Sequence, residues 1–253
     1  MSIKLFLLGR PGSGKSTAFH SIASYVPEQF YGWSVTRFND YQILEQMFSH
    51  QNLYPMMHRH KMFHATEHGG FDVVNFSVLD SALKNIEDEA RKISSPKREE
   101  LITIEFARDN YDEALKQFHS SFLEDAYFLF INADVKTCIQ RVRVRVTEPP
   151  TLDNHFVSER ILNGYYNKQH IPSTIVTNKG VKIQRSRVKV ISSECSLNDF
   201  TIKVEHFIDD IFAHECDYFI RDEIHNNYMR RPLVASVSAT MHKISYKRLV
   251  KLS

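Results

Sequence analysis

A short apolar run followed at once by a glycine-rich segment limits the fold of this chain more than any other feature. Residues 3–8 read IKLFLL and residues 9–17 read GRPGSGKST, which fits the pattern G-x-x-x-x-G-K-[ST]. Glycines let the backbone curl so that successive N–H groups point inward at a phosphate group. A helix expected from Gly14 to about Val26 would add the partial positive charge of its N-terminus. This order predicts a phosphate-binding loop and argues against an ordinary glycine-rich turn.

Each part of the segment 9–17 has an expected role in binding a nucleotide. Lys15 can bridge the β- and γ-phosphates, and the hydroxyl group of Ser16 can bind a magnesium ion. ATP and Mg²⁺ are therefore the expected cofactors. The residues expected to contact the nucleotide are Gly9, Arg10, Pro11, Gly12, Ser13, Gly14, Lys15, Ser16 and Thr17.

The rest of the chain alternates between strand-like and helix-like segments, which is typical of an α/β protein with a parallel sheet. Further strands are expected at 34–39, 101–106, 127–132 and 188–191. Further helices are expected at 42–49, 77–93, 111–122, 135–146, from near 156, and at 197–212. A main domain is expected over about 1–220, followed by a polar, basic tail over 221–253.

Composition excludes several classes of protein. With 253 residues, 42% of them apolar, the chain can bury one substantial core. A net charge of +2 gives no strong overall attraction to nucleic acid or membrane. Three cysteines without a C-x-x-C pair indicate reduced thiols, and no segment approaches the roughly 20 apolar residues of a membrane span. We therefore expect a soluble, cytoplasmic protein.

Three segments of the chain carry a family resemblance: PGSGKST at 11–17, LITIEFAR at 101–108 and YFLFINADVKTCIQRVRVR at 127–145. Together they resemble the P-loop kinases of the nucleoside and nucleotide kinase type, such as adenylate, thymidylate and deoxynucleoside kinases. The resemblance covers about residues 1–215. It implies a three-layer α/β P-loop NTPase fold, with a parallel sheet, helices on both faces, a lid over 141–156 and a helical acceptor-binding insertion over 40–75.

The activity that this resemblance implies is Mg²⁺-dependent transfer of phosphate from ATP to a nucleoside, a nucleotide or a similar small metabolite. Two alternatives remain open. One is a kinase of RNA ends or of aminoacyl-tRNA. The other is a nucleotide-binding regulator that hydrolyses slowly and signals by lid closure.

Arginines alternate with valines in RVRVRV at 141–146. On a helix, Arg141 and Arg145 share one face and Arg143 points elsewhere. Two guanidinium groups on one closing element suit the negative charge that spreads over a phosphoryl group during transfer. A strand is a second interpretation, and it would place all three arginines on one face. A solvated basic face is a third.

Glu105 and Arg108 follow the end of a predicted strand, at the edge where open α/β sheets bind ligands. The resemblance implies that Glu105 supports the metal ion together with Ser16, and that Arg108 holds a phosphate of the donor or acceptor. In those enzymes the two residues are adjacent, whereas Phe106 and Ala107 separate them here. A buried structural ion pair is the alternative.

Asp40 follows the predicted strand 34–39. In the kinases that the chain resembles, a carboxylate at this place binds the acceptor and receives the proton of its attacking hydroxyl group. A base is useful for a hydroxyl acceptor and largely unnecessary for a phosphate acceptor. The alternative is an Asp that caps the next helix. The same resemblance places the adenine of the donor near Ser192–Glu194.

Histidines recur every four residues at His60, His64 and His68, which on a helix would share one face. A zinc site is one interpretation, although the spacing is not H-E-x-x-H. An acceptor-binding lobe and a solvated surface are the others. Within such a lobe, Arg59 is the best candidate to bind an anionic acceptor.

The tail mixes basic and aromatic residues, a composition that can bind RNA or DNA. Its members are Tyr228, Arg230, Arg231, Lys243, Tyr246, Lys247, Arg248 and Lys251. A solvated face, or a subunit contact in a homodimer, is the favoured interpretation. The expected partner is a small-molecule acceptor, with no membrane partner.

Overall fold

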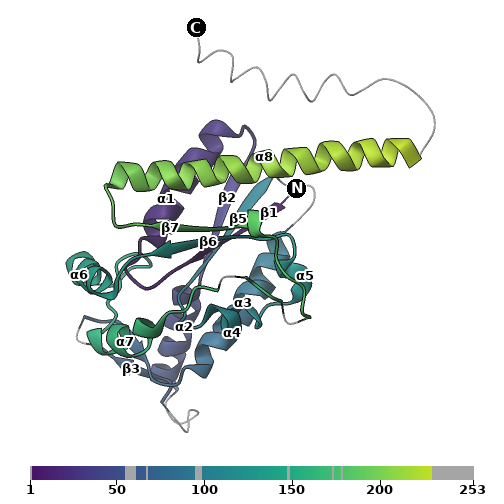
Figure 1. Ribbon diagram of the computed structural model, residues 1–253. Helices are drawn as coiled ribbons and strands as arrows, with labels where there is room; N and C mark the ends of the chain where they lie inside the picture. Colours follow the sequence, from purple (N-terminus) through teal and green to yellow (C-terminus); the bar gives the residue numbers. More distant parts are fainter. Residues whose placement is uncertain are drawn as a thin grey trace. The chain divides into compact units, whose positions relative to one another are not determined.

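The computed structural model describes residues 2–54, 61–66, 68–94, 99–146, 149–172, 174–177 and 179–229, with side chains as far as residue 216 (Figure 1). The chain divides into two units, Met1–Ile211 and Phe212–Ser253. The first unit holds the sheet, the helices that cover it and the candidate site. Within the described residues, no helix combines the length and the apolar character that a membrane span requires.

Five parallel strands form the central sheet, in the order β2-β5-β1-β6-β7. The strands are β1 (Ser2–Leu8), β2 (Ser34–Asn39), β5 (Glu100–Phe106), β6 (Tyr127–Asn132) and β7 (Val188–Ser192). Side chains of the central strands β1, β5 and β6 are buried almost throughout, as expected for a parallel sheet that is covered on both faces. The predicted parallel α/β sheet is confirmed.

Helices cover both faces of this sheet (Figure 1). On one face lie α1 (Lys15–Gln29) and the first turns of α8 (Leu197–Met229). On the other lie α3 (Ser77–Ile93), α4 (Tyr111–Leu115) and α5 (Ser120–Leu123). The main core joins α3, α4 and α5 to the apolar side chains of β1, β5 and β6, and T-shaped and stacked phenylalanine rings around Phe6 form its centre.

Two helices differ from their predicted extents for identifiable reasons. The single helix expected at 111–122 is two short helices, because His119 adopts an extended conformation and its N–H and imidazole ring bind the buried carboxylate of Glu87. The last helix continues to Met229 instead of ending near 212. The chain has no glycine or proline between residues 197 and 229, so no residue of the kind that ends a helix interrupts it.

The acceptor-binding region expected at 40–75 is only partly helical. It contains α2 (Asp40–Leu53), which begins earlier than expected because the Asn39 side chain accepts a hydrogen bond from the N–H of Tyr41. An antiparallel pair follows, β3 (Phe63–Ala65) and β4 (Phe71–Val73). Rings from this pair pack against α2 and α3 in a second core. The described part of the region 40–75 therefore consists of one helix and a short antiparallel pair of strands.

The arginine-rich segment is a helix, α6 (Val135–Arg145), which rules out the strand interpretation. Asp134 caps it by accepting hydrogen bonds from the N–H groups of Lys136 and Thr137. The helix expected from near 156 begins three residues later as α7 (Glu159–Gly164), because Ser158 caps it. Short 3₁₀ turns at Tyr166–Lys168 (η2) and Arg185–Arg187 (η3) complete the described structure.

Candidate functional site

The glycine-rich loop connects the C-terminal end of β1 to α1. Gly12 and Gly14 have φ angles of +82° and +106°, in the left-handed range that glycine adopts without strain. A Cβ atom at Gly12 would lie 2.5 Å from the carbonyl oxygen of Cys138 in α6. The loop therefore rests directly on the backbone of α6.

The side chain of Lys15 is buried and folds back over this loop. Its Nζ atom donates hydrogen bonds to the carbonyl oxygens of Gly9, at 2.8 Å, and Arg10, at 3.0 Å. Burial lowers the pKa of Lys15, and the carboxylates of Glu105 and Asp40 oppose that shift. The ammonium group thus lies beside the N-terminus of α1, where the helix dipole also favours an anion.

Residues of the predicted loop 9–17 have different surroundings. Pro11, Gly12, Lys15 and Ser16 line a cavity. Arg10 instead anchors the loop, because its guanidinium group donates to the carbonyl oxygens of Ala133 and Tyr166. The side chain of Thr17 is exposed on α1.

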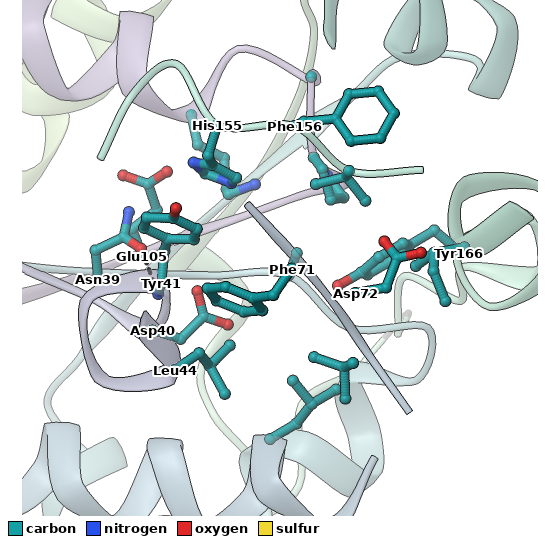
Figure 2. Close-up of a pocket in the computed structure, with 18 of the residues that line it drawn as sticks. Asn39, Asp40, Tyr41, Leu44, Phe71, Asp72, Glu105, His155, Phe156 and Tyr166 are labelled. Carbon is teal, nitrogen blue, oxygen red and sulfur yellow. Dashed lines mark hydrogen bonds between the residues drawn. The ribbon is translucent and has the colours of Figure 1, made fainter. Parts of the chain in front are cut away.

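This cavity lies where β2 and β5 end (Figure 2). Part of the lining comes from the loop, and another part comes from aromatic rings of α2, β4 and the segment 155–157. The polar side chains of Asn39, Asp40 and Glu105 also line it, at the strand ends. Ligands of open parallel sheets bind at this edge, as the sequence predicts.

Asp40 and Arg108 form a buried ion pair in the cavity wall, with 3.1 Å between Nη1 of Arg108 and Oδ2 of Asp40. Arg108 also donates to the carbonyl oxygens of Ala107 and Leu79, so it is held by the protein itself. Burial raises the pKa of Asp40, and Arg108 and Lys15 only partly offset this effect. Asp40 is not the helix cap, since Asn39 fills that role.

Glu105 is paired with Arg37 of β2, which sequence analysis did not single out. Arg37 donates to Oε2 of Glu105 from Nη2, at 2.5 Å, and from Nε, at 3.0 Å. Its Nη2 also donates to the hydroxyl oxygen of Ser16, at 3.1 Å, and its Nη1 lies 2.8 Å from Oδ1 of Asp153. Glu105 and Arg108 therefore have separate partners and do not form an ion pair with each other.

The expected magnesium ligands can be tested against these contacts. Ser16, Glu105 and Asp153 offer hard oxygen atoms of the kind that Mg²⁺ prefers. All three already bind one guanidinium group, that of Arg37. Among the described residues, no group of three or more His, Cys, Asp or Glu side chains is placed to hold a metal ion. The oxygen atoms are of the kind that binds Mg²⁺, but the guanidinium group of Arg37 lies between them.

The arginines of α6 have three different environments. Arg141 donates to Oγ and the carbonyl oxygen of Ser193, and so ties α6 to the loop after β7. Arg143 points away and pairs with Glu159, as the helical interpretation predicts. Arg145 faces the cavity, and burial lowers its pKa. Its Nε atom has no hydrogen-bond partner within the described part of the chain.

The segment 149–157 crosses beside the loop, and two of its side chains, Asp153 and His155, have a shifted pKa. Asp153 accepts a hydrogen bond from His20 of α1 and lies against Arg37. Burial would raise the pKa of Asp153, but the hydrogen bonds from His20 and Arg37 outweigh burial and lower it. Burial, assisted by Arg145, lowers the pKa of His155 to about 3, so its imidazole ring is neutral.

The rings of Tyr41, Phe71 and His155 lie together in the lining of the cavity (Figure 2). The ring of Tyr41 stacks on His155, with 3.8 Å between centroids, and on Phe71, with 5.4 Å. Asp72 follows Phe71 and is buried beside the cavity, where its Oδ1 accepts a hydrogen bond from the N–H of Ser158. This end of the cavity is therefore flat-walled and lined by rings and carboxylates.

Some of the predicted positions lie near the cavity but do not line it. Others lie outside the described residues. Ser193 of the predicted adenine loop lies 3.5 Å from where a Cβ atom of Gly14 would be. His64 is in strand β3, so the helical face required by the zinc interpretation does not form there. Arg59 and His60 lie outside the described residues, as do positions 230–253 of the tail.

Sequence reasoning missed Arg37, Asp153, His155 and the Phe71–Asp72 pair. Arg37 alone had a usable signal, because a charged residue in a predicted strand of a parallel sheet requires a buried partner. Asp153 and His155 fall in an irregular segment, where no periodicity indicates which side chains turn inward.

Comparisons with known proteins identify the fold. No protein-family model and no curated protein matches the sequence. The crystal structure of Kti12 from Chaetomium thermophilum, in complex with ADP-AlF3, aligns with a TM-score of 0.51 at 16% identity, over 82% of this chain and 98% of that chain. A gluconokinase from Sinorhizobium meliloti 1021 aligns over 87% and 97% of the two chains, with a TM-score of 0.47 and 11% identity. A thymidylate kinase from Ehrlichia chaffeensis aligns over 82% and 98%, with a TM-score of 0.40 and 16% identity. The chain has the P-loop kinase fold, as its three segments indicate.

Proposed function

We propose that this chain is an ATP-dependent kinase that transfers the γ-phosphate to a hydroxyl group of a small molecule. One observation carries the proposal: a single cavity joins the cationic phosphate loop to the buried carboxylate of Asp40. A phosphoryl-transfer enzyme needs both, because it must stabilise the spreading charge of the phosphoryl group and orient its attacking group.

The donor end of the cavity suits the phosphates of a nucleotide. The loop N–H groups and the N-terminus of α1 would bind the β-phosphate. Lys15 and Arg145 would neutralise the negative charge of the transferred group, and Arg145 has an Nε donor without a partner among the described residues. Kti12, which shares the fold, was crystallised with ADP-AlF3, and this supports a nucleoside diphosphate as the product.

The acceptor end suits a hydroxyl group. Its oxygen would attack the γ-phosphorus, the bond to the β–γ bridging oxygen would break, and ADP would leave with that electron pair. The hydroxyl proton would pass to Oδ1 of Asp40, since Oδ2 is 3.1 Å from Arg108. The raised pKa of Asp40 makes it a stronger base than an exposed carboxylate. Arg108 is then a positioning residue rather than a phosphate ligand.

The shape of the acceptor end favours a molecule with a ring. The cavity volume is about 80 Å³, and a water molecule occupies roughly 10–15 Å³ by such a measure. A cavity of this volume accommodates one ring or the reacting end of a larger molecule. Stacked rings at Tyr41 and Phe71 suit a planar group, which agrees with a nucleoside or a similar small metabolite.

The proposal is tested by transfer of labelled γ-phosphate from ATP to a panel of nucleosides, nucleoside monophosphates and sugars. Lys15→Ala should lower transfer by about 10³-fold or more, and Asp40→Asn by about 10²- to 10⁴-fold, by loss of charge stabilisation and of the base. Lys116→Ala, on the exposed face of the protein, is the matched control.

Full activity in Lys15→Ala would overturn the proposal. Nucleotide binding with only slow hydrolysis across the panel would also overturn it, and would favour a regulatory nucleotide-binding protein.

A further inference from the structure

Arg37 contacts two carboxylates and one hydroxyl group, all beside the phosphate loop. Its side chain is 9% exposed and projects from β2 between the phosphate loop and the end of β5. It is held on one side by Glu105 and Ser16 and on another by Asp153. The ring of Phe19 lies 4.4 Å from the central carbon of its guanidinium group and supports that group from beneath.

These oxygen partners are the atoms that a divalent cation would require beside the phosphate loop. Mg²⁺ needs oxygen ligands at about 2.0–2.1 Å in octahedral geometry. The guanidinium group already donates to Ser16 and Glu105, and its Nη1 lies 2.8 Å from Asp153. A metal ion on the same oxygen atoms would collide with this group and be repelled by its charge.

Arg37 is also poorly placed to move aside. Its departure would leave Glu105, 4% exposed, without the cation that pairs with it. A buried carboxylate without a partner is strongly unfavourable. The fork of the guanidinium group matches oxygen ligands in several directions at once, as a metal ion does.

We propose that Arg37 is the resident cation of the phosphate site, so that the chain binds nucleoside di- and triphosphates without a divalent ion. This rests on the proposed function, because it assumes that the loop binds a nucleotide. Arg37, Lys15 and Arg145 would then supply the positive charge near the phosphates, with Arg37 at the position beside Ser16.

The test is the affinity for ADP, measured by isothermal titration calorimetry in buffer with Mg²⁺ and in buffer with EDTA. Wild-type protein should bind ADP within about threefold in the two buffers. Arg37→Gln should lose about tenfold or more in EDTA and regain affinity when Mg²⁺ is added. Arg143→Gln removes an exposed arginine and is the matched control, expected to behave as wild type.

A second readout does not depend on nucleotide. Titration with Mn²⁺, followed by electron paramagnetic resonance, should detect no site beside Ser16 in the wild-type protein and a new site in Arg37→Gln. Arg37→Lys keeps the charge but loses the fork, so it should bind ADP in EDTA better than Arg37→Gln does.

Wild-type affinity that falls about tenfold or more in EDTA would overturn the proposal, whatever the variants do and whether or not they fold. If ADP binds in neither buffer, the proposed kinase function fails as well. If ADP binds only with Mg²⁺, the kinase function stands and this inference alone fails.

Discussion

The two ends of the cavity are built in opposite ways. The donor end is formed largely by one contiguous loop, of which Pro11, Gly12, Lys15 and Ser16 line the cavity. The acceptor end is formed by side chains from α2, β4 and the segment 155–157, which are far apart along the chain. Binding through the backbone requires a local motif, whereas binding through side chains requires the whole fold to be in place.

Charge separates the two ends as well. The cationic side chains Lys15, Arg37 and Arg145 lie at the donor end, and the carboxylates of Glu105 and Asp153 are close to them. At the acceptor end, rings, aliphatic side chains and the carboxylates of Asp40 and Asp72 line the cavity. Both Nη atoms of Arg108 are bound there by Asp40 and by carbonyl oxygens, whereas its Nε has no hydrogen-bond partner among the described residues. Changes at one end should therefore leave binding at the other largely intact.

The largest effect is expected from Arg108→Leu, which removes the support of the acceptor end. This variant leaves Asp40 in a buried position without its cation and should lower the free energy of unfolding by about 3–5 kcal/mol. Urea denaturation measures the loss. The exposed pair of Arg143 and Glu159 provides the control, and Arg143→Leu should change stability by no more than about 1 kcal/mol. Equal effects in the two variants would contradict a supporting role for Arg108.

A smaller effect is expected from Phe71→Leu, which removes one ring of the stack. Stacked rings contribute about 0.5–1.5 kcal/mol beyond their buried area, so KM for a ring-bearing acceptor should rise about 3- to 10-fold. The affinity for ADP should not change, because Phe71 belongs to the part of the lining that comes from aromatic rings and not to the loop. Steady-state kinetics and ADP titration measure the two quantities, and Tyr31→Leu, at a side chain that is 91% exposed, is the control. An equal loss of ADP affinity would show that the two ends are not separable.

The smallest effect concerns the pH dependence of stability and involves His155. Its pKa is about 3 in the folded chain and about 6.5 in an unfolded one, so the unfolded state binds more protons between these values. The free energy of unfolding should therefore fall as pH decreases from 7 to 5.5, by about 1 kcal/mol more in wild type than in His155→Phe. Urea denaturation at the two pH values checks this. Equal pH dependence in both proteins would mean that folding does not lower the pKa of His155.

Elements with a strong local pattern coincide with their predicted limits. Ser77–Ile93 carries a long apolar stripe, and Tyr127–Asn132 is a continuous apolar run, so the period and the ends are both unambiguous. The helix expected at 111–122 is broken by a contact between His119 and Glu87, which are 32 residues apart. No local pattern could reveal that contact.

In the candidate site, too, a local motif indicates some residues, whereas others are brought together only by the fold. Lys15 and Ser16 follow from the loop motif alone, and Asp40 from its place after a strand. The partners of Asp40 and Glu105 could not be assigned, because each lies 68 residues away along the chain, Arg108 just after β5 and Arg37 on β2. The order β2-β5 pairs them, and only the assembled sheet shows that Arg37 faces Glu105 while Arg108 faces Asp40.

The contact between Gly12 and α6 constrains which residues can occupy position 12 during evolution. Position 12 excludes larger residues for two reasons that involve no ligand: its φ of +82° and the carbonyl oxygen of Cys138, 2.5 Å from where a Cβ would lie. A related protein that no longer bound any nucleotide would still be under selection to keep a glycine at this position. Lys15 has no comparable packing constraint, because the hydrogen bonds of its ammonium group within the described part of the chain go to the backbone carbonyl oxygens of Gly9 and Arg10. In related proteins that have lost phosphate binding, we expect Lys15 to be substituted before the glycine at position 12.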